Sequence, residues 1–277
     1  MTLRIYATSH SITPFTESTL AGDFIQNISR VYNENKIDIR LYMPKYGFIS
    51  DRKYILREVI RLKEIPVFYK NDDIIPSVKS AFIPETRVQV YFLVYPEFYK
   101  KIPKNLADTA AVTQYESWDT CTVLFNHTSI LTLEHLYWQP DIMLCFNAES
   151  ALTPFLLNAK YGNKDWYKPT KPVLILSNDS EFKAFSPDIL KDYDIPESDD
   201  DLTDSLGLLK SAIRHSKGVI VLNNGNESKI QTLLEDKSVK KLLEQKREQY
   251  LNHSIQNPDE NTWNETSKQI YHFLETI

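Results

Sequence analysis

The chain has 277 residues, of which 42% are hydrophobic and 25% are charged, and its formal net charge is −5 at pH 7. This composition is typical of a globular protein with enough apolar surface for a core, and the net negative charge argues against a nucleic-acid partner. The sequence has no run of about 18 apolar residues, and its N-terminal stretch lacks the apolar segment of a signal peptide. We therefore expect a cytoplasmic protein without a membrane span.

Hydrophobic periodicity predicts alternating strands and helices along most of the chain. The predicted elements, in chain order, are a strand at 3–7, a helix at 19–33, a strand at 37–43, short strands within 58–68, 77–83 and 87–93, a helix at 117–135, a strand at 141–146, a helix at 150–161, a strand at 172–176, a helix at 202–215, a strand at 218–222 and a last helix at 263–274. The first strand–helix–strand unit favours a parallel sheet with right-handed crossovers, and the short strands indicate an antiparallel insertion. We predict an α/β fold with a doubly wound, mostly parallel, Rossmann-like sheet over residues 1–230 and a small antiparallel insertion. A helical tail, residues 231–277, is expected to pack on this domain.

The segment 138–157, with the sequence WQPDIMLCFNAESALTPFLL, predicts a buried strand, a short turn and a helix. Ligands of open α/β sheets bind at such junctions, beyond the carboxyl end of the strand. The turn, residues 146–149, contains no histidine, glycine or cation. The position at which such junctions usually carry a reactive side chain therefore has none. Asn147 and Glu149, with Asn178 after the next strand, are candidates for binding a polar ligand. Alternatively, Asn147 only turns the chain and Glu149 only stabilises a helix start, where negative charge is favourable.

Residue types and spacings argue against several common sites. The six histidines form no pair at metal-ligand spacing, and the sequence lacks a GxSxG nucleophile elbow. With six glycines and neither GxGxxG nor GxxxxGK, no cofactor is expected. His10 follows the first strand but is expected to be a surface-loop histidine, and the acidic run 199–201 is expected to be solvated. Cys121 and Cys145 lie in apolar segments and are expected to be buried, reduced thiols.

Four segments stand out, in order: ITPFTESTLAGD (12–23), DIRLYMPKYGFI (38–49), WQPDIMLCFNAESALTPFLL (138–157) and KPVLILSND (171–179). Together they resemble one protein family, the N-terminal domain of bacterial glycogen synthases and plant starch synthases. A strand ending in MPKYG is typical of this family, and LLKSAIRHSKGVIVL (208–222) resembles its next helix and strand. The resemblance covers about residues 3–230, and the run 52–62 is similar to that of short, one-domain members from the Bacteroidetes. It implies one half of a two-domain GT-B fold, with ADP-glucose as the sugar donor and an α-1,4-glucan as the acceptor.

The first motif departs from the family pattern P-F-x-K-T-G-G-L-x-D, which corresponds to residues 14–23. Glu17 stands where a lysine meets the sugar-nucleotide phosphates, and Thr19 and Leu20 replace two glycines. Two unit charges about 4 Å apart interact by about 1 kcal/mol in water and about 4 kcal/mol at an effective dielectric of 20. Exchanging lysine for glutamate turns this attraction into repulsion and should weaken pyrophosphate binding. The resemblance still implies Glu17, Gly22 and Asp23 as candidate substrate-binding positions.

The second motif lacks the family's reactive groups. In the pattern D-I-x-H-x-H-D-W, which corresponds to residues 141–148, Phe146 replaces the active-site histidine and Ala148 replaces the tryptophan. Ser177 replaces the histidine of a later T-I-H-N pattern. A full synthase also has a second domain of similar size, which carries most of the nucleotide contacts. This sequence contains no segment that resembles it.

These observations favour a catalytically degenerate synthase-like domain, without a catalytic residue, that binds α-glucan or a protein partner or regulates glycogen metabolism. The alternative is an active α-1,4-glucan glucosyltransferase that uses ADP-glucose and is completed by a separate nucleotide-binding chain. A third hypothesis is a different small-molecule site formed by Asn147, Glu149 and Asn178.

Overall fold

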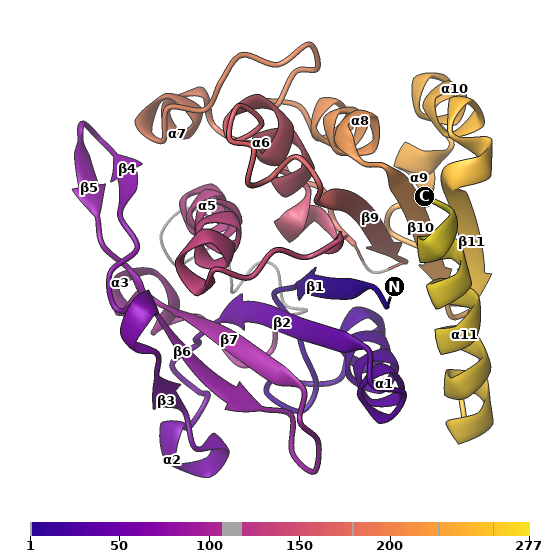
Figure 1. The fold of residues 1–277 in the computed structure, drawn as a ribbon. Helices are drawn as coiled ribbons and strands as arrows, with labels where there is room; N and C mark the ends of the chain where they lie inside the picture. Colours follow the sequence, from indigo (N-terminus) through magenta and orange to yellow (C-terminus); the bar gives the residue numbers. More distant parts are fainter. Residues whose placement is uncertain (1, 107–117, 179, 227, 257) are drawn as a thin grey trace.

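The computed structural model describes residues 2–106, 118–178, 180–226, 228–256 and 258–277, and its centre is one large sheet (Figure 1). Within these residues the strands are joined in the order β11-β10-β9-β8-β1-β2-β7-β6-β3. The strand bounds are β1 (Arg4–Thr8), β2 (Asp38–Pro44), β3 (Arg57–Glu58), β6 (Ser77–Phe82), β7 (Gln89–Val94), β8 (Ile142–Phe146), β9 (Lys171–Ser177), β10 (Gly218–Asn223) and β11 (Tyr250–Ser254). A separate hairpin pairs β4 (Val67–Tyr69) with β5 (Asp72–Ile74).

Neighbouring strands from β11 to β7 run parallel, whereas β6 and β3 are added to the edge in antiparallel fashion. The predicted mostly parallel sheet with a small antiparallel insertion is therefore confirmed. The order of strands reverses between β1 and β8, because the chain first builds the sheet to one side of β1 and then to the other. Such a switch point opens a crevice at the carboxyl ends of the two strands, where ligands of this class of sheet bind.

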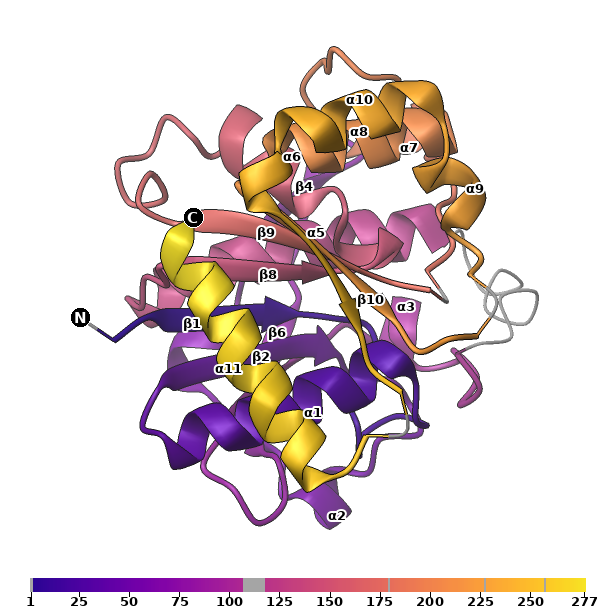
Figure 2. The same cartoon turned by 90° about the vertical axis from the view of Figure 1, so that its right-hand side faces the viewer.

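Helices cover both faces of the sheet (Figures 1 and 2). One face is covered by α1 (Leu20–Glu34) and α11 (Glu260–Thr276), and the other by α5 (Trp118–Leu136), α6 (Thr153–Ala159), α8 (Ser205–His215) and α10 (Lys237–Gln245). Shorter elements connect them: α2 (Asp51–Tyr54), α3 (Pro96–Tyr99), α7 (Pro187–Asp192), α9 (Gln231–Leu234) and the 3₁₀ turns η1 (Ile60–Leu62), η2 (Ala148–Ser150) and η3 (Arg247–Gln249).

Burial explains why the central elements form. Strand β8 is a continuous apolar run that is buried at every position, as expected for a parallel strand covered on both faces. Helix α5 is enclosed on most sides and is therefore apolar around much of its circumference. Across the ranges that the structure describes, α5 included, no helix is both long and apolar enough to cross a membrane.

The segment 231–277 differs from the predicted helical tail. It contains α9, α10 and α11, but it also contains β11, which pairs in parallel with β10 and extends the sheet. The sequence YLNHS lacks the hydrophobic pattern that predicts a strand. The reason is that β11 lies at the edge of the sheet, where it is only partly buried and tolerates polar residues. The final helix was expected, and its buried face includes Trp263, Ile270 and Leu274.

Candidate functional site

A pocket of about 120 Å³ opens at the switch point, close to the carboxyl ends of β1 and β8. Its walls come from the loop after β1, the turn after β8, the loop after β9 and the start of α5. We call it the switch-point pocket. The polar residues of its lining include Ser9, His10, Ser11, Thr19, Tyr46, Thr122, Asn147, Glu149, Ser180, Lys183 and Lys229.

Hydroxyl groups hold the loop after β1 against the start of α1. The Ser11 Oγ lies 2.8 Å from the Thr16 Oγ1 and 3.0 Å from the Thr19 Oγ1, and Thr19 also caps α1 by accepting from the Gly22 N–H. A Cβ added at Gly22 would lie 3.0 Å from both the Ser11 Oγ and the Thr19 Oγ1. The predicted position Gly22 therefore lies directly behind the pocket wall, where a side chain would displace the hydroxyls that form it.

The other two predicted positions of this loop, Glu17 and Asp23, are not part of the lining that the described residues form. The Asp23 carboxylate accepts hydrogen bonds from the Thr13 Oγ1 at 2.7 Å and the Ser18 Oγ at 2.5 Å, so it fixes the loop. The Glu17 side chain is half exposed and forms an ion pair with Lys104, with 3.4 Å between the Lys104 Nζ and the Glu17 Oε1. The Glu17 carboxylate is thus paired with a lysine at the protein surface.

Asn147 lies at the turn after β8 and lines the pocket. Its backbone angles, φ 58° and ψ −168°, belong to a region that is essentially restricted to glycine. Three hydrogen bonds hold it there: its N–H donates to the Ile175 carbonyl (2.7 Å), and its Oδ1 accepts from the Ser177 N–H (2.8 Å) and the Ser177 Oγ (2.9 Å). Asn147 therefore turns the chain and also places its side chain beside the pocket, which combines the two alternatives drawn from the sequence.

The positions at which the family pattern has histidines are occupied by structural residues. Phe146 is buried, and its ring centre lies 6.0 Å from that of Phe24 on α1. Ser177 is buried and donates to Asn147. These replacements support each other, because the serine hydroxyl satisfies the asparagine that replaces the family's aspartate.

Glu149 also lines the pocket, on the short turn η2. Its backbone carbonyl accepts a hydrogen bond from the Asn126 Nδ2 of α5 at 2.7 Å, which fixes the turn against the helix. Burial, and to a smaller degree the nearby Glu149 carboxylate, raises the pKa of Tyr46 well above its usual value. The pocket therefore holds a neutral phenol next to a carboxylate.

The third polar candidate, Asn178, lines a different cavity, beyond the loops that follow β9 and β10. Its Nδ2 donates to the Asn224 Oδ1 at 2.7 Å, and its backbone carbonyl accepts from the Lys229 N–H at 2.7 Å. The structure thus brings Asn147 and Glu149 together in one pocket, whereas Asn178 lines the neighbouring cavity.

His10 is not the surface-loop histidine that we expected from the sequence. It lines the switch-point pocket, its ring packs edge-on against Phe125 of α5 with 4.5 Å between ring centres, and Tyr46 donates to its backbone carbonyl. Its Nε2 atom is enclosed and has no hydrogen-bond partner among the described residues. Burial lowers the pKa of His10 to about 3, so the imidazole is neutral at physiological pH.

The pocket contains more polar and charged groups than the turn after β8 suggested, because other segments supply the cations that this turn lacks. Lys183 and Lys229 line it, from the loops after β9 and β10, and Lys229 forms an ion pair with Glu181 at 3.7 Å. The Thr122 Oγ1 of α5 is buried without a hydrogen-bond partner among the described residues. A sequence argument confined to one junction could not find groups that three other segments contribute.

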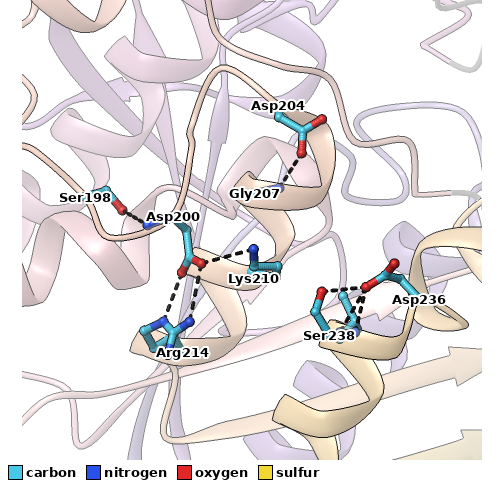
Figure 3. A network of polar contacts seen from close by, with 9 residues as sticks. Ser198, Asp200, Asp204, Gly207, Lys210, Arg214, Asp236 and Ser238 are labelled. Atoms are coloured by element: carbon cyan, nitrogen blue, oxygen red, sulfur yellow. Dashed lines mark hydrogen bonds and ion pairs between the residues drawn. The ribbon is translucent and has the colours of Figure 1, made fainter.

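Other predicted features lie outside the pocket. The described residues contain no group of three or more histidine, cysteine, aspartate or glutamate side chains that could hold a metal ion, and Cys121 and Cys145 are buried and not joined in a disulfide. The acidic run 199–201 is not simply solvated, because the Asp200 carboxylate is 3% exposed and binds two cations of α8 (Figure 3). Arg214 contacts it through two hydrogen bonds, of 2.9 and 3.3 Å, and the Lys210 Nζ lies 3.5 Å away.

Comparisons with known proteins agree with the geometry of the sheet. A family profile described as the starch synthase catalytic domain matches residues 4–245. The glycogen synthase of Chlorobium phaeobacteroides is 31% identical over 175 residues, which cover 63% of this chain and 36% of that protein. The glycogen synthase of Chlorobaculum parvum is 29% identical over 216 residues, which cover 77% of this chain and 44% of that protein.

A solved structure has a similar fold. The catalytic domain of starch synthase IV from Arabidopsis thaliana, bound to ADP and acarbose, superimposes with a TM-score of 0.71 at 14% sequence identity. The match covers 91% of this chain and 51% of that chain. The chain therefore spans about half, or less, of the length of the proteins that it resembles.

Proposed function

The chain belongs to the family of the starch synthase catalytic domain, and from this premise we propose that it is a glucan-binding, catalytically degenerate glycosyltransferase-like domain of glycogen metabolism. The observation that supports this most strongly is the chemistry of the switch-point pocket. Hydroxyls, the Asn147 amide and the Glu149 carboxylate converge there, and the charges of Glu149 and Glu181 are matched by Lys183 and Lys229. Such a balanced, hydroxyl-rich lining suits a neutral sugar better than a phosphate.

The first loop argues against tight binding of a sugar nucleotide. Glu17 occupies the position at which the family has a phosphate-binding lysine, and its ion pair with Lys104 also engages a nearby cation. An approaching pyrophosphate would have to break this pair and would meet a carboxylate, which repels it by roughly 1–4 kcal/mol at about 4 Å. Glucan binding requires no such contact, since the ligand is uncharged.

A second candidate function is an active α-1,4-glucan glucosyltransferase that uses ADP-glucose. It is favoured by His10, whose neutral imidazole lines the pocket and has an Nε2 without a hydrogen-bond partner among the described residues, and by the cation Lys183, which also lines the pocket. In this case a separate chain would have to supply the nucleotide-binding half of the cleft. Under either function we propose that residues 1–230 carry the site and that residues 231–277 complete the sheet and its helical cover.

One experiment separates the two functions. Purified protein is incubated with radiolabelled ADP-glucose and glycogen, with and without cell extract, and glycogen binding is measured in parallel by affinity electrophoresis. Retardation by glycogen without incorporation of label supports the degenerate glucan-binding domain. Incorporation that the extract enables, and that His10→Gln abolishes, supports the transferase. A protein that neither binds glycogen nor transfers glucose contradicts both.

The pocket itself is tested with Glu149→Gln. A hydrogen bond to a carboxylate is worth about 1 kcal/mol more than one to a neutral acceptor, so affinity for maltoheptaose should fall about fivefold. Glu260→Gln, at an exposed position on α11 far from the pocket in sequence, is the matched control and should leave the affinity unchanged. Equal affinities for the two variants would remove Glu149 from the site.

A further inference from the structure

A second cavity, of about 830 Å³, lies between α10 and the end of the sheet formed by β10 and β11. Figure 2 shows α10 above these two strands, with α9 beside them. We call this cavity the amide groove. Its lining on the sheet side includes Asn178, Val221, Asn223, Tyr250 and Asn252, and on the helix side Lys240, Leu243, Glu244 and Arg247.

The parallel register places the groove's carboxamides on one face of the sheet. Val221 pairs with Asn252 and Val219 with Tyr250, and side chains at paired positions of parallel strands share a face. Asn223 is two residues beyond Val221 and therefore lies on the same face. Strand β11 thus presents Tyr250 and Asn252, two residues apart, next to Asn223 of β10.

The opposite wall is one side of α10 and its continuation. Lys240, Leu243, Glu244 and Arg247 are spaced by three or four residues, the spacing at which side chains lie above one another on a helix. The side chains of Asn252 and Arg247 form no hydrogen bond or ion pair with another described residue. They are therefore available to a ligand, whereas Asn178 is held by Asn224 and serves as a wall.

The charges of the groove decide between classes of ligand. Lys240 and Arg247 are matched by Glu235 and Glu244, so neither an anion nor a cation is favoured overall. A carboxamide presents both a donor and an acceptor, which matches pairs of neighbouring hydroxyls, and a tyrosine ring offers a flat surface for the C–H face of a sugar ring. These features suit a neutral chain of sugar units.

We propose that the amide groove is a second saccharide-binding site, which holds an α-1,4-linked glucan chain beside the switch-point pocket. The two cavities adjoin, because Lys229 lines the pocket, Asn178 lines the groove, and the Lys229 N–H donates to the Asn178 carbonyl at 2.7 Å. A chain that occupied both would be bound at two points, which increases its overall affinity without a new contact in either site. This inference rests on the proposed glucan-binding function.

The test is a titration of isotope-labelled, full-length protein with maltoheptaose, followed by amide chemical shifts in NMR spectra. Shifts at residues 221–223 and 250–252 support the groove, and shifts at 147–149 support the pocket. Shifts confined to the pocket overturn the groove and leave the proposed function intact. Shifts confined to the groove support this inference and contradict the role of the pocket, and no shift at either place overturns both.

Variants measure the contribution of the groove. Asn252→Ala and Tyr250→Leu each remove a hydrogen bond or a stacking surface, so the affinity for maltoheptaose should fall about three- to tenfold. Asn261→Ala, on the exposed first turn of α11, is the matched control. Thermal melting of each variant checks that it is folded, and two folded groove variants with wild-type affinity would refute the proposal.

Discussion

Replacing Asp200 by asparagine tests how the loop before α8 is anchored (Figure 3). The carboxylate is almost fully buried and binds Arg214 in a bidentate manner, with Lys210 as a second cation. Breaking a fully buried pair by removing one partner costs about 3–5 kcal/mol. Here the side chains of Arg214 and Lys210 keep 44% and 27% of their exposure, so water solvates the cations that are left behind. We therefore expect a loss of about 2 kcal/mol in the free energy of unfolding.

Such a loss should lower the melting temperature by about 4–8 °C, at about 2–4 °C per kcal/mol for a chain of this size. Differential scanning calorimetry of Asp200→Asn measures it. The neighbouring Asp199 is exposed, so Asp199→Asn is the matched control and should change the stability by less than about 0.5 kcal/mol. If the two variants melt together, the buried ion pair does not stabilise this loop and the reasoning is refuted.

Three further results are expected. Burial lowers the pKa of His127 to about 3, so protons bind the unfolded state preferentially below about pH 6.5, and stability should fall by about 2 kcal/mol between pH 7 and pH 5. Urea unfolding of His127→Gln should show a correspondingly smaller loss, and an unchanged pH dependence would contradict this. Asn147→Ala removes the acceptor for two Ser177 donors and should cost about 2–3 kcal/mol, whereas Asn147→Asp keeps the acceptor and should cost less than about 1 kcal/mol in thermal melts. Glu17→Lys breaks an exposed ion pair with Lys104 and should lower the free energy of unfolding by less than about 1 kcal/mol. Calorimetric titration of this variant should nevertheless show at least fivefold tighter ADP binding, because a lysine attracts the phosphates. An unchanged affinity would show that this loop is not a phosphate site.

The sequence was most informative where burial dictates residue type. The continuous apolar runs of β8 and β9 and the one-sided pattern of α1 can be satisfied only inside a sheet that is covered on both faces, so the fold class followed from them. Strand β11 escaped prediction for the converse reason. It lies at the edge of the sheet, where its backbone pairs with β10 on one side and its side chains are only partly buried, so they need not be apolar.

The candidate site could be predicted only where one local segment forms it. Asn147 and Glu149 line the pocket because a single strand–turn–helix carries them. His10 was missed because its burial depends on Phe125, a ring on a helix far along the chain. The surface ion pair of Glu17 likewise depends on Lys104, which no motif of the first loop contains.

The packing of α11 on α1 has a consequence for the order of events during synthesis. The Tyr32 hydroxyl of α1 donates to the Ser267 carbonyl, and the Trp263 ring of α11 lies beside Phe24. Residues 20–34 are synthesised long before residues 260–276, so the part of α1 that faces α11, around Phe24 and Tyr32, lacks this cover until α11 has emerged. The nascent chain must therefore keep this part of α1 from other proteins, by chaperones or by transient contacts, until α11 has been synthesised.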